Sequence, residues 1–244
     1  MRNKSRLDQL LVERGLAGSR ERAKALIMSG SVLVNDEPQT KAGTLIGEEA
    51  IIRLRAQDHP YVSRGALKLA RALEAFKIEP VGWVAADIGA STGGFSEVLL
   101  GAGVARVYAI DVGHNQLDWK IRNDPRVIVL EKLNARYLTK ESLPELVDLV
   151  VVDVSFISLL KLAPALREIS RPGAQWVTLI KPQFEVGPEK VGKGGIVQSA
   201  DVRHGAIDEV TRGFEVLGLE RLALIDSPIT GTHGNHEFLA HWKR

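Results

Sequence analysis

Four charged residues lie beside apolar segments, where an unused charge is costly: Lys68 in SRGALKL, Asp153 after LVVV, Lys181 after WVTLI, and Glu237 in GNHEF. Two lysines and two carboxylates can together take a proton from a hydroxyl group. A lysine is protonated in water, but a neighbouring cation and partial burial favour its neutral, basic form. Taken singly, Lys68 also fits a solvated helix edge and Glu237 an ordinary strand edge.

A glycine-rich segment, AADIGASTGGFSEVLL, joins an apolar strand to a helix. Gly89, Gly93 and Gly94 let the backbone approach a ligand, and the helix that opens near Gly94 offers free N–H groups. The spacing differs from the G-x-G-x-x-G fingerprint, which disfavours a pyrophosphate. About twenty residues downstream, Asp111 ends the strand YAID, where a carboxylate can bind both hydroxyls of a ribose. These features indicate a nucleoside site.

The elements that must position these residues alternate between strand and helix from Tyr61 onward. Strand patterns occur at WVAADIG, ARVYAIDV, VIVLE, LVDLVVVDVS and QWVTLIK. This rhythm predicts an α/β fold with a doubly wound, mostly parallel Rossmann-like sheet. Asp111, Asp153 and Lys181 then lie at the carboxyl ends of strands, where such sheets bind ligands. A helix near 199–217 and strands at LERLALIDS and HEFLAHW predict a terminal antiparallel pair.

Residues 5–56 follow a different pattern. Leu7, Leu10 and Leu11 recur at helical spacing, and a second helical stretch begins after Ser19. Alternation in SVLVN and EEAIIRLR predicts short strands, which makes this a small α+β unit. Residues 1–24 contain seven Lys or Arg against three acidic residues, a local charge of +4. A basic helical pair fits phosphate groups, and a solvated helix face explains the charge equally well.

Composition limits the alternatives. The 244 residues allow two domains, which we predict at 1–58 and 59–244, with a linker in RAQDHP at 55–60. Hydrophobic residues at 45% and charged residues at 25% exclude a disordered or fibrous chain. The absence of cysteine excludes disulfides and thiolate chemistry. We read no signal peptide and no membrane span, and expect a cytoplasmic protein without membrane or metal partners.

The N-terminal segment resembles the S4-like RNA-binding domain of a ribosomal protein and of pseudouridine synthases. The resemblance is carried by RLDQLLVERG, SRERAKALIMSGSVLVN and KAGTLI. In that family the basic helical pair grips structured RNA. The resemblance therefore implies phosphate contacts for four cations, Arg6, Arg20, Arg22 and Lys24.

The segment DIGASTGGFS resembles the first motif of ribose-methylating RNA methyltransferases, which use S-adenosylmethionine. The resemblance implies that the methionine part of the cofactor lies against Asp87, Gly89, Ala90, Ser91, Gly93, Gly94 and Phe95. It also implies that Asp111 holds the ribose, that Asn134 approaches the adenine and that Asp153 borders the cofactor. Asn134 fits a simple turn former equally well.

The order Lys68, Asp153, Lys181, Glu237 matches the catalytic tetrad of the FtsJ-like 2′-O-methyltransferases. The family's roles imply that Lys181 is the base and that the other three position it and the hydroxyl. The sequence itself does not show which lysine is neutral. We call these four residues the tetrad.

The whole chain resembles the TlyA family, which joins an S4-like domain to an FtsJ-like methyltransferase domain. Further matching segments are SRGALKL, VDVSFISL, IKPQFEVGPEKVGKGGIV and GTHGNHEF. Members methylate cytidine 2′-hydroxyls in ribosomal RNA, so the resemblance implies ribosomal RNA or ribosomal subunits as partners. Some members have been named haemolysins. The glycine-rich loop, residues 186–195 with Lys190 and Lys193, is expected to be a mobile arm that touches RNA or closes the pocket. A flexible surface loop fits these residues equally well.

Three other functions fit the sequence less well. A membrane-active haemolysin requires a signal peptide, an amphipathic or spanning segment or a large exposed apolar surface, and the sequence shows none of them. An RNA-binding module without catalysis leaves the tetrad unexplained. A small-molecule methyltransferase leaves the basic N-terminal domain unexplained. Methylation of ribosomal RNA accounts for both features.

Overall fold

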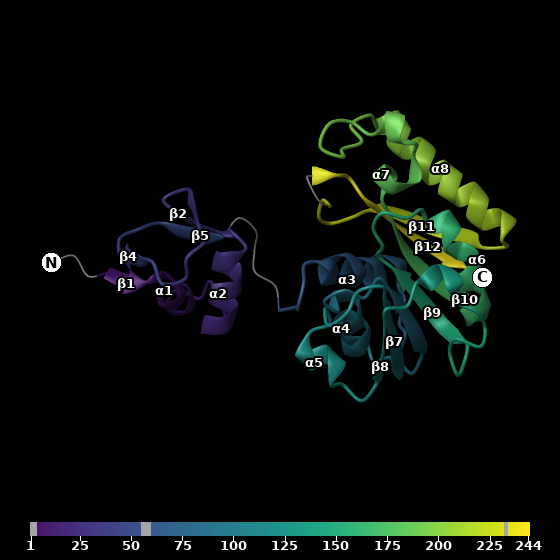
Figure 1. The fold of residues 1–244 in the computed structure, drawn as a ribbon, viewed down its shortest axis with the longest axis horizontal. Helices are drawn as coiled ribbons and strands as arrows, with labels where there is room; N and C mark the ends of the chain where they lie inside the picture. The colour runs from purple at the N-terminus through teal and green to yellow at the C-terminus, as the bar shows by residue number, and fades with distance from the viewer. Residues whose placement is uncertain (1–3, 55–59, 232–233) are drawn as a thin grey trace. The chain divides into compact units, whose positions relative to one another are not determined.

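The computed structural model describes residues 4–54, 60–231 and 234–244. The chain divides into two compact units, Met1–Pro60 and Tyr61–Arg244 (Figure 1). The predicted domain boundary between residues 58 and 59, like most of the predicted linker, lies outside the described residues. Each unit has its own hydrophobic core.

The N-terminal unit combines two helices with short strands. Its elements are β1 Lys4–Arg6, α1 Leu7–Glu13, α2 Arg20–Met28, β2 Val32–Val34, β3 Glu37–Gln39, β4 Leu45–Gly47 and β5 Ile52–Leu54. Strand β1 pairs with β4, and β2 pairs with both β3 and β5. Asn35 and Asp36 have φ values of 50° and 68°. Positive φ at both residues fits the tight two-residue turn between β2 and β3.

The core of this unit is formed by one face of each helix and by the strands. Its buried members are Leu7, Leu10, Leu11, Ala17, Ala23, Ile27, Val32, Val34, Ile46 and Ile52. The second helix begins where the sequence predicts, because the Ser19 hydroxyl oxygen accepts the N–H of Arg22 (3.1 Å) and caps α2. In α1, the leucines at helical spacing form the buried face, as their pattern predicts.

A buried carboxylate lies at the start of α1. Asp8 has no exposed side-chain surface, and the guanidinium groups of Arg6 and Arg20 lie 3.0 Å and 3.2 Å from its oxygens. The hydrogen bond from Arg6, supported by Arg20 and opposed by burial, lowers the pKa of Asp8 to about 2. The two arginine side chains remain 44% and 49% exposed. Both cations thus have a structural role in addition to the RNA contact expected of them.

We expect Asp8→Asn to lower the unfolding free energy of the N-terminal unit by about 1–2 kcal/mol at neutral pH, because two half-exposed arginines lose a charged acceptor. The folded-state pKa is lowered, so the carboxylate stabilises the unit above about pH 4 and this effect is lost as the pH falls toward 2. Hydrogen exchange of the α1 amides in the full-length protein measures the change. Asp36→Asn, which removes an exposed ion pair with Arg53, is the control. An equal loss in both variants would contradict the prediction.

The C-terminal unit is built on a seven-stranded sheet. Its helices are α3 Gly65–Phe76, α4 Gly94–Gly101, α5 Trp119–Arg122, η1 Ala135–Tyr137, η2 Leu159–Lys161, α6 Ala163–Ile169, α7 Pro182–Glu185, η3 Pro188–Lys190 and α8 Ala200–Val216. Its strands are β6 Val84–Ile88, β7 Arg106–Asp111, β8 Val127–Glu131, β9 Val147–Val152, β10 Ser170–Ile180, β11 Glu220–Asp226 and β12 Phe238–Lys243.

The strand order is β11-β12-β10-β9-β6-β7-β8. The five strands β6 to β10 form a parallel sheet, and β12 is antiparallel to both β10 and β11. The predicted doubly wound sheet is confirmed, and the antiparallel pair lies at the end of the chain as expected. Strand β9 is buried at every position except Asp148, which explains its nearly continuous apolar sequence.

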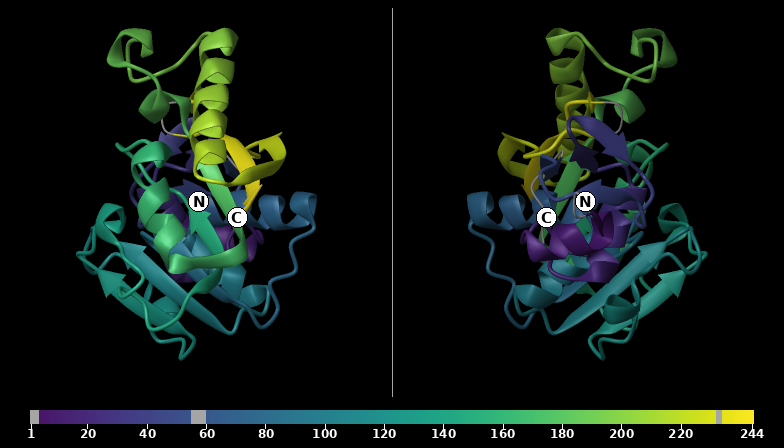
Figure 2. Two further views of the ribbon diagram at one scale, coloured as in Figure 1. Left: turned by 90° about the vertical axis from the view of Figure 1, so that its right-hand side faces the viewer. Right: turned by 90° about the vertical axis from the view of Figure 1, so that its left-hand side faces the viewer.

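Helices cover both faces of this sheet (Figures 1 and 2). Helices α3 and α4 pack against one face, and α6 and α8 pack against the other. Helix α8 buries Ile207, Val210 and Phe214 and begins at the capping residue Ser199. Within the ranges that the structure describes, no helix has both the length and the apolar character needed to cross a membrane.

The strand order reverses between β6 and β9. Strand β6 pairs with β7 on one side and with β9 on the other, so the carboxyl ends of β6 and β9 border the crevice where doubly wound sheets bind ligands. A Cβ at Gly89 would lie 2.4 Å from the Asp153 carbonyl oxygen, and φ of Gly89 is +83°. Only glycine fits this close approach of two strand ends.

Candidate active site

The loop after β6 packs tightly against the start of α3. A Cβ at Gly94 would lie 2.2 Å from Ser63 Oγ and 3.0 Å from the Ala66 nitrogen. At Gly93, φ is +95° and a Cβ would meet a Leu117 methyl carbon at 2.9 Å. Gly93 and Gly94 are therefore needed for packing, and their contact with a ligand stays a prediction.

Asp111, at the end of β7, faces this loop. Its Oδ2 accepts the Ser91 N–H at 2.8 Å, and its Oδ1 accepts the Gly113 N–H at 2.6 Å. The carboxylate borders a cavity of about 470 Å³, which we call the nucleoside cavity. Its wall also includes apolar side chains, namely Ile88, Ile110, Val112, Leu133, Val154, Ile157 and Leu162. Each carboxylate oxygen has a further lone pair for a ribose hydroxyl, so the residues present fit a nucleoside.

Asn134 lines the same cavity and also caps a short helix. Its Oδ1 accepts the Arg136 N–H at 3.0 Å and caps the short helix η1. The turn-forming role is thus present, and the approach of Asn134 to an adenine stays a prediction.

The tetrad surrounds a second cavity of about 330 Å³, which we call the tetrad cavity. Lys68 Nζ lies 2.7 Å from Glu237 Oε2 and 3.6 Å from Asp153 Oδ2. Lys181 Nζ lies 2.6 Å from Asp153 Oδ1 and 3.1 Å from Ser155 Oγ. Asp153 therefore lies between the two ammonium groups.

Four separate elements bring the tetrad together. Lys68 comes from the first turns of α3, Asp153 and Lys181 directly follow β9 and β10, and Glu237 directly precedes β12. Strands β9 and β10 are parallel neighbours, so their carboxyl ends meet. Strand β12 runs antiparallel to β10, and its first residue therefore lies at the same edge. Lys68 and Lys181 are each 8% exposed and Glu237 is 4% exposed, which makes this a buried cluster of charge.

The two cavities share a wall. Gly89, Ser91, Asp153 and Ser155 line both of them. The space lined by Asp111 therefore adjoins the charged groups of the tetrad cavity. The described parts of the chain contain no group of three or more His, Asp or Glu that could hold a metal ion.

Asp87 lies beneath the loop. Its side chain is fully buried, its Oδ2 accepts the Ser96 hydroxyl hydrogen (2.7 Å), and its Oδ1 has no hydrogen-bond partner within the described ranges. Neither Asp87 nor Gly93 is among the described residues that line the two cavities, whereas Ala90 and Phe95 line the tetrad cavity. Asp87 supports the loop from below, and its contact with the cofactor stays a prediction.

We expect Asp87→Asn to change the pH dependence of stability. Burial, reinforced by the charges of Asp153 and Asp111 and opposed by Ser96, raises the pKa of Asp87 to about 7. The folded protein then holds a proton that the unfolded chain releases, so wild-type stability falls as the pH rises from about 4 to about 7. The uncharged side chain of the Asp87→Asn variant avoids this loss of unfolding free energy, which has a limiting slope of about 1.4 kcal/mol per pH unit.

Denaturant unfolding of both cofactor-free proteins at several pH values between about 5 and 8 measures this effect. The stability difference should grow in favour of the variant up to about pH 7 and then level off. A difference that is independent of pH would show that Asp87 is ionised throughout.

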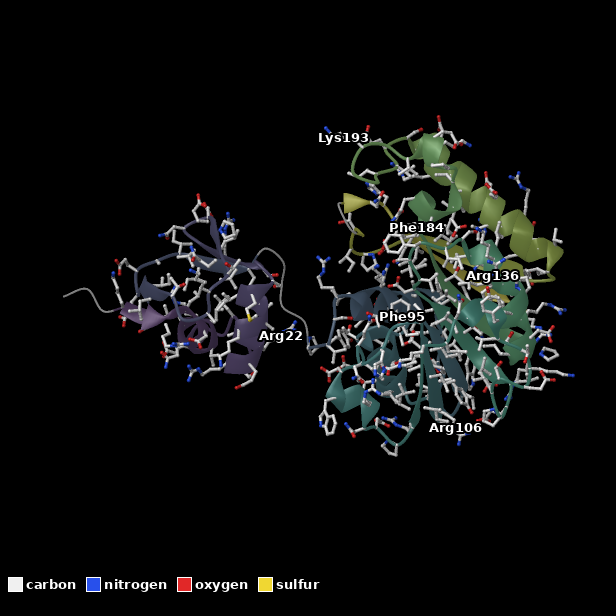
Figure 3. All side chains as sticks on the ribbon, viewed as in Figure 1. Arg22, Phe95, Arg106, Arg136, Phe184 and Lys193 are labelled. Atoms are coloured by element: carbon white, nitrogen blue, oxygen red, sulfur yellow. The ribbon has the colours of Figure 1, made fainter. Side chains whose placement is uncertain are left out.

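The cations expected to bind RNA lie in both units. Arg22 and Lys24 are on α2, and Lys24 is exposed. Lys190 and Lys193 are exposed on the glycine-rich loop (Arg22 and Lys193 are labelled in Figure 3). Gly192 in this loop forms an antiparallel bridge with Ile196, directly after the loop, so the segment has local structure.

Sequence reasoning missed several residues near the tetrad. Ser155 contacts Lys181, and Phe156 has φ of +65°, is 91% exposed and lies 5.2 Å from the Phe184 ring between centroids. Glu185 and Asn235 bridge neighbouring segments through side-chain hydrogen bonds. All lie inside segments that carry the family resemblance, but serine, asparagine and glutamate are also ordinary loop residues. A positive φ at phenylalanine leaves no mark in the sequence.

A doubly wound sheet that places a nucleoside cavity against buried lysines and carboxylates defines a nucleoside-dependent group-transfer enzyme. The family model for FtsJ-like methyltransferases matches residues 61–244, and the S4 domain model matches residues 5–52. The chain belongs to the FtsJ-like methyltransferase family, in its TlyA branch with an N-terminal S4 domain.

Full-length relatives agree with this assignment. The chain is 46% identical over its whole length, and over 91% of the relative, to the Mycobacterium tuberculosis 16S/23S rRNA (cytidine-2′-O)-methyltransferase TlyA. It is 40% identical to Hemolysin A of Brachyspira hyodysenteriae, with 97% of this chain and 99% of the relative covered. A solved structure of a candidate haemolysin from Streptococcus thermophilus has a TM-score of 0.79 at 42% identity, covering 100% of this chain and 90% of the other.

Proposed function

We propose that this protein transfers the methyl group of S-adenosylmethionine to the ribose 2′-hydroxyl of a cytidine in ribosomal RNA. The observation that carries the proposal is the wall shared by the two cavities, with Lys181 and Asp153 2.6 Å apart beside it. A methyl donor in the nucleoside cavity then faces a proton acceptor in the tetrad cavity. The name of the M. tuberculosis relative supports ribosomal RNA as the substrate.

The residues of the nucleoside cavity suit the adenosine part of this cofactor. Asp111 would hold the ribose hydroxyls, Asn134 would border the adenine, and the Gly89–Ser91 segment leads toward the tetrad. When bound, S-adenosylmethionine supplies a methyl group on a cationic sulfur that leaves without help from an acid. The task left to the chain is to orient the hydroxyl group and to remove its proton.

Lys181 is the base in this proposal. Its side-chain amine would accept the hydroxyl proton as the methyl group passes from sulfur to the ribose oxygen, and the electron pair of the carbon–sulfur bond would stay on sulfur. Asp153 holds the Lys181 amine from one side, and Ser155 holds it from another. Lys68 is held in turn by Glu237 and contacts Asp153, so it fixes the orientation of that carboxylate.

The N-terminal unit supplies the second half of the proposal. S4 domains bind RNA in the families that this segment resembles, and Arg22 and Lys24 of α2 would contact phosphates. Ribosomal RNA, free or within a ribosomal subunit, is the proposed partner, and the cytoplasm is the proposed location. A small-molecule substrate would leave this unit without a task.

Transfer of labelled methyl groups from S-adenosylmethionine to naked ribosomal RNA and to each purified ribosomal subunit tests the proposal, with mapping of the modified nucleotide. Asp153→Ala is the control, because it removes the carboxylate between the two lysines. We expect labelled 2′-O-methylcytidine with the wild type and none with the variant. Cofactor binding without transfer to any ribosomal RNA would refute the proposed substrate.

A further inference from the structure

Asn235 is a buried side chain that joins two loops. It is 4% exposed and lies two residues before Glu237. Its Oδ1 accepts the Val197 N–H at 3.2 Å, and its Nδ2 donates to the Gly195 carbonyl oxygen at 2.8 Å. Both groups of the carboxamide thus bind the backbone at the end of the glycine-rich loop.

The segment around Asn235 also encloses the Glu237 carboxylate. The Asn235 carbonyl oxygen accepts the Gly231 N–H at 2.8 Å, and a Cβ at Gly231 would lie 2.0 Å from Glu237 Oε1. Gly231 and Glu237 line the tetrad cavity together. The Glu237 carbonyl oxygen accepts the Ser227 N–H at 2.9 Å. Any displacement of Asn235 therefore reaches the carboxylate that holds Lys68.

The other end of the glycine-rich loop is attached to the segment that follows Asp153. Glu185, directly before the loop, accepts the Ser158 hydroxyl hydrogen at 2.6 Å and the Leu159 N–H at 3.0 Å. Helix α7, which contains Glu185, begins immediately after Lys181, and Ser158 follows the segment that contains Asp153. The loop is thus fastened at its start to the segment after Asp153 and at its end to the segment before Glu237.

We propose that Asn235 is a positioning residue that couples the glycine-rich loop to Glu237, so that contact of this loop with RNA sets the geometry of the tetrad. The inference rests on the proposed function for the identity of the substrate. Lys190 and Lys193 are exposed on the loop and present cations to a phosphate backbone. In this proposal, a shift of the loop on contact with RNA reaches the Glu237 carboxylate through Asn235.

Asn235→Ala in the full-length protein tests the coupling. Hydrogen exchange of the cofactor-free protein should become at least tenfold faster at the amide of Val197 and also at that of Ser227, which reports on Glu237. The single-turnover rate of methyl transfer at saturating ribosomal RNA should fall at least tenfold. The affinity for S-adenosylhomocysteine should change less than twofold, because Asn235 is not among the described residues that line the nucleoside cavity.

Asn123→Ala is the matched control, since it removes an asparagine hydrogen bond to a backbone carbonyl on α5. It should leave both amides and the transfer rate unchanged. If Asn235→Ala does not fold, Asn235→Gln takes its place, because it keeps the carboxamide but displaces it by one methylene group.

Two results would overturn the coupling. One is a faster exchange at Val197 with unchanged exchange at Ser227, and the other is a normal transfer rate despite faster exchange at both amides. Failure of the wild type to methylate ribosomal RNA would refute the proposed substrate instead. In that case the exchange at Ser227 still decides whether the loop and Glu237 are linked.

Discussion

Lys181→Ala is expected to lower the rate of methyl transfer by about 10²- to 10⁴-fold, the usual contribution of a positioned base. The variant should still bind S-adenosylhomocysteine with near wild-type affinity, since Lys181 lines the tetrad cavity and is not among the described residues of the nucleoside cavity. Single-turnover transfer to ribosomal RNA and calorimetric titration with S-adenosylhomocysteine measure the two quantities. Their separation is the central expectation, because it distinguishes lost chemistry from lost binding.

Two further variants sharpen this test. Lys181→Arg keeps a cation beside Asp153, but a guanidinium group does not release its proton in the neutral range, so this variant should be as inactive as the alanine variant. Lys161→Ala removes an exposed lysine of η2 and should retain full activity. Activity in the arginine variant would show that the position needs positive charge and would exclude Lys181 as the base.

Reversing two charges on α2, with Arg22→Glu and Lys24→Glu together, is expected to weaken binding to ribosomal RNA by about 10- to 100-fold at low salt. The slope of log affinity against log salt should shrink by about two, because two phosphate contacts are lost. Arg20 is left unchanged because it holds Asp8, and its loss would also destabilise the unit. Filter binding at several salt concentrations measures both effects.

The matched control for this variant changes the net charge by the same amount elsewhere. Arg212→Glu with Lys243→Glu reverses two exposed cations of the C-terminal unit. Its RNA affinity should stay within about threefold of the wild type, apart from the general effect of net charge. Equal weakening by both pairs would indicate a non-specific charge effect, and the assignment of α2 as a phosphate-binding surface would fail.

The sequence predicts the sheet of the C-terminal unit well because its signal is local. Apolar runs such as LVDLVVVDVS are typical of strands buried on both faces, and helical patterns separate several of these runs. The carboxyl ends of such strands meet at one edge. The convergence of Asp111, Asp153 and Lys181 on one edge therefore follows from topology alone.

The remaining geometry depends on contacts between segments that are distant in sequence. The sequence places both Asp87 and Asp111 at the cofactor, and nothing in it shows that Asp87 is fully buried and is not among the described residues that line either cavity. The sequence does not show that Arg6 and Arg20 both bind Asp8. This contact forms because the start of α1 meets α2 there. The hydrogen bonds of Asn235 likewise depend on distant segments, because its partners Val197 and Gly195 lie about forty positions away in the sequence.

The wall shared by the two cavities has a consequence for inhibitor design. A single molecule that joins an adenosine group to a ribose mimic would occupy the volumes of about 470 Å³ and 330 Å³ at once. Because Gly89, Ser91, Asp153 and Ser155 line both spaces, the two spaces adjoin and a short connector suffices. Joining the two groups makes the second binding event intramolecular, which raises its effective concentration to the millimolar range or above. Selectivity over enzymes that bind only the adenosine part would then come from the buried charges of the tetrad.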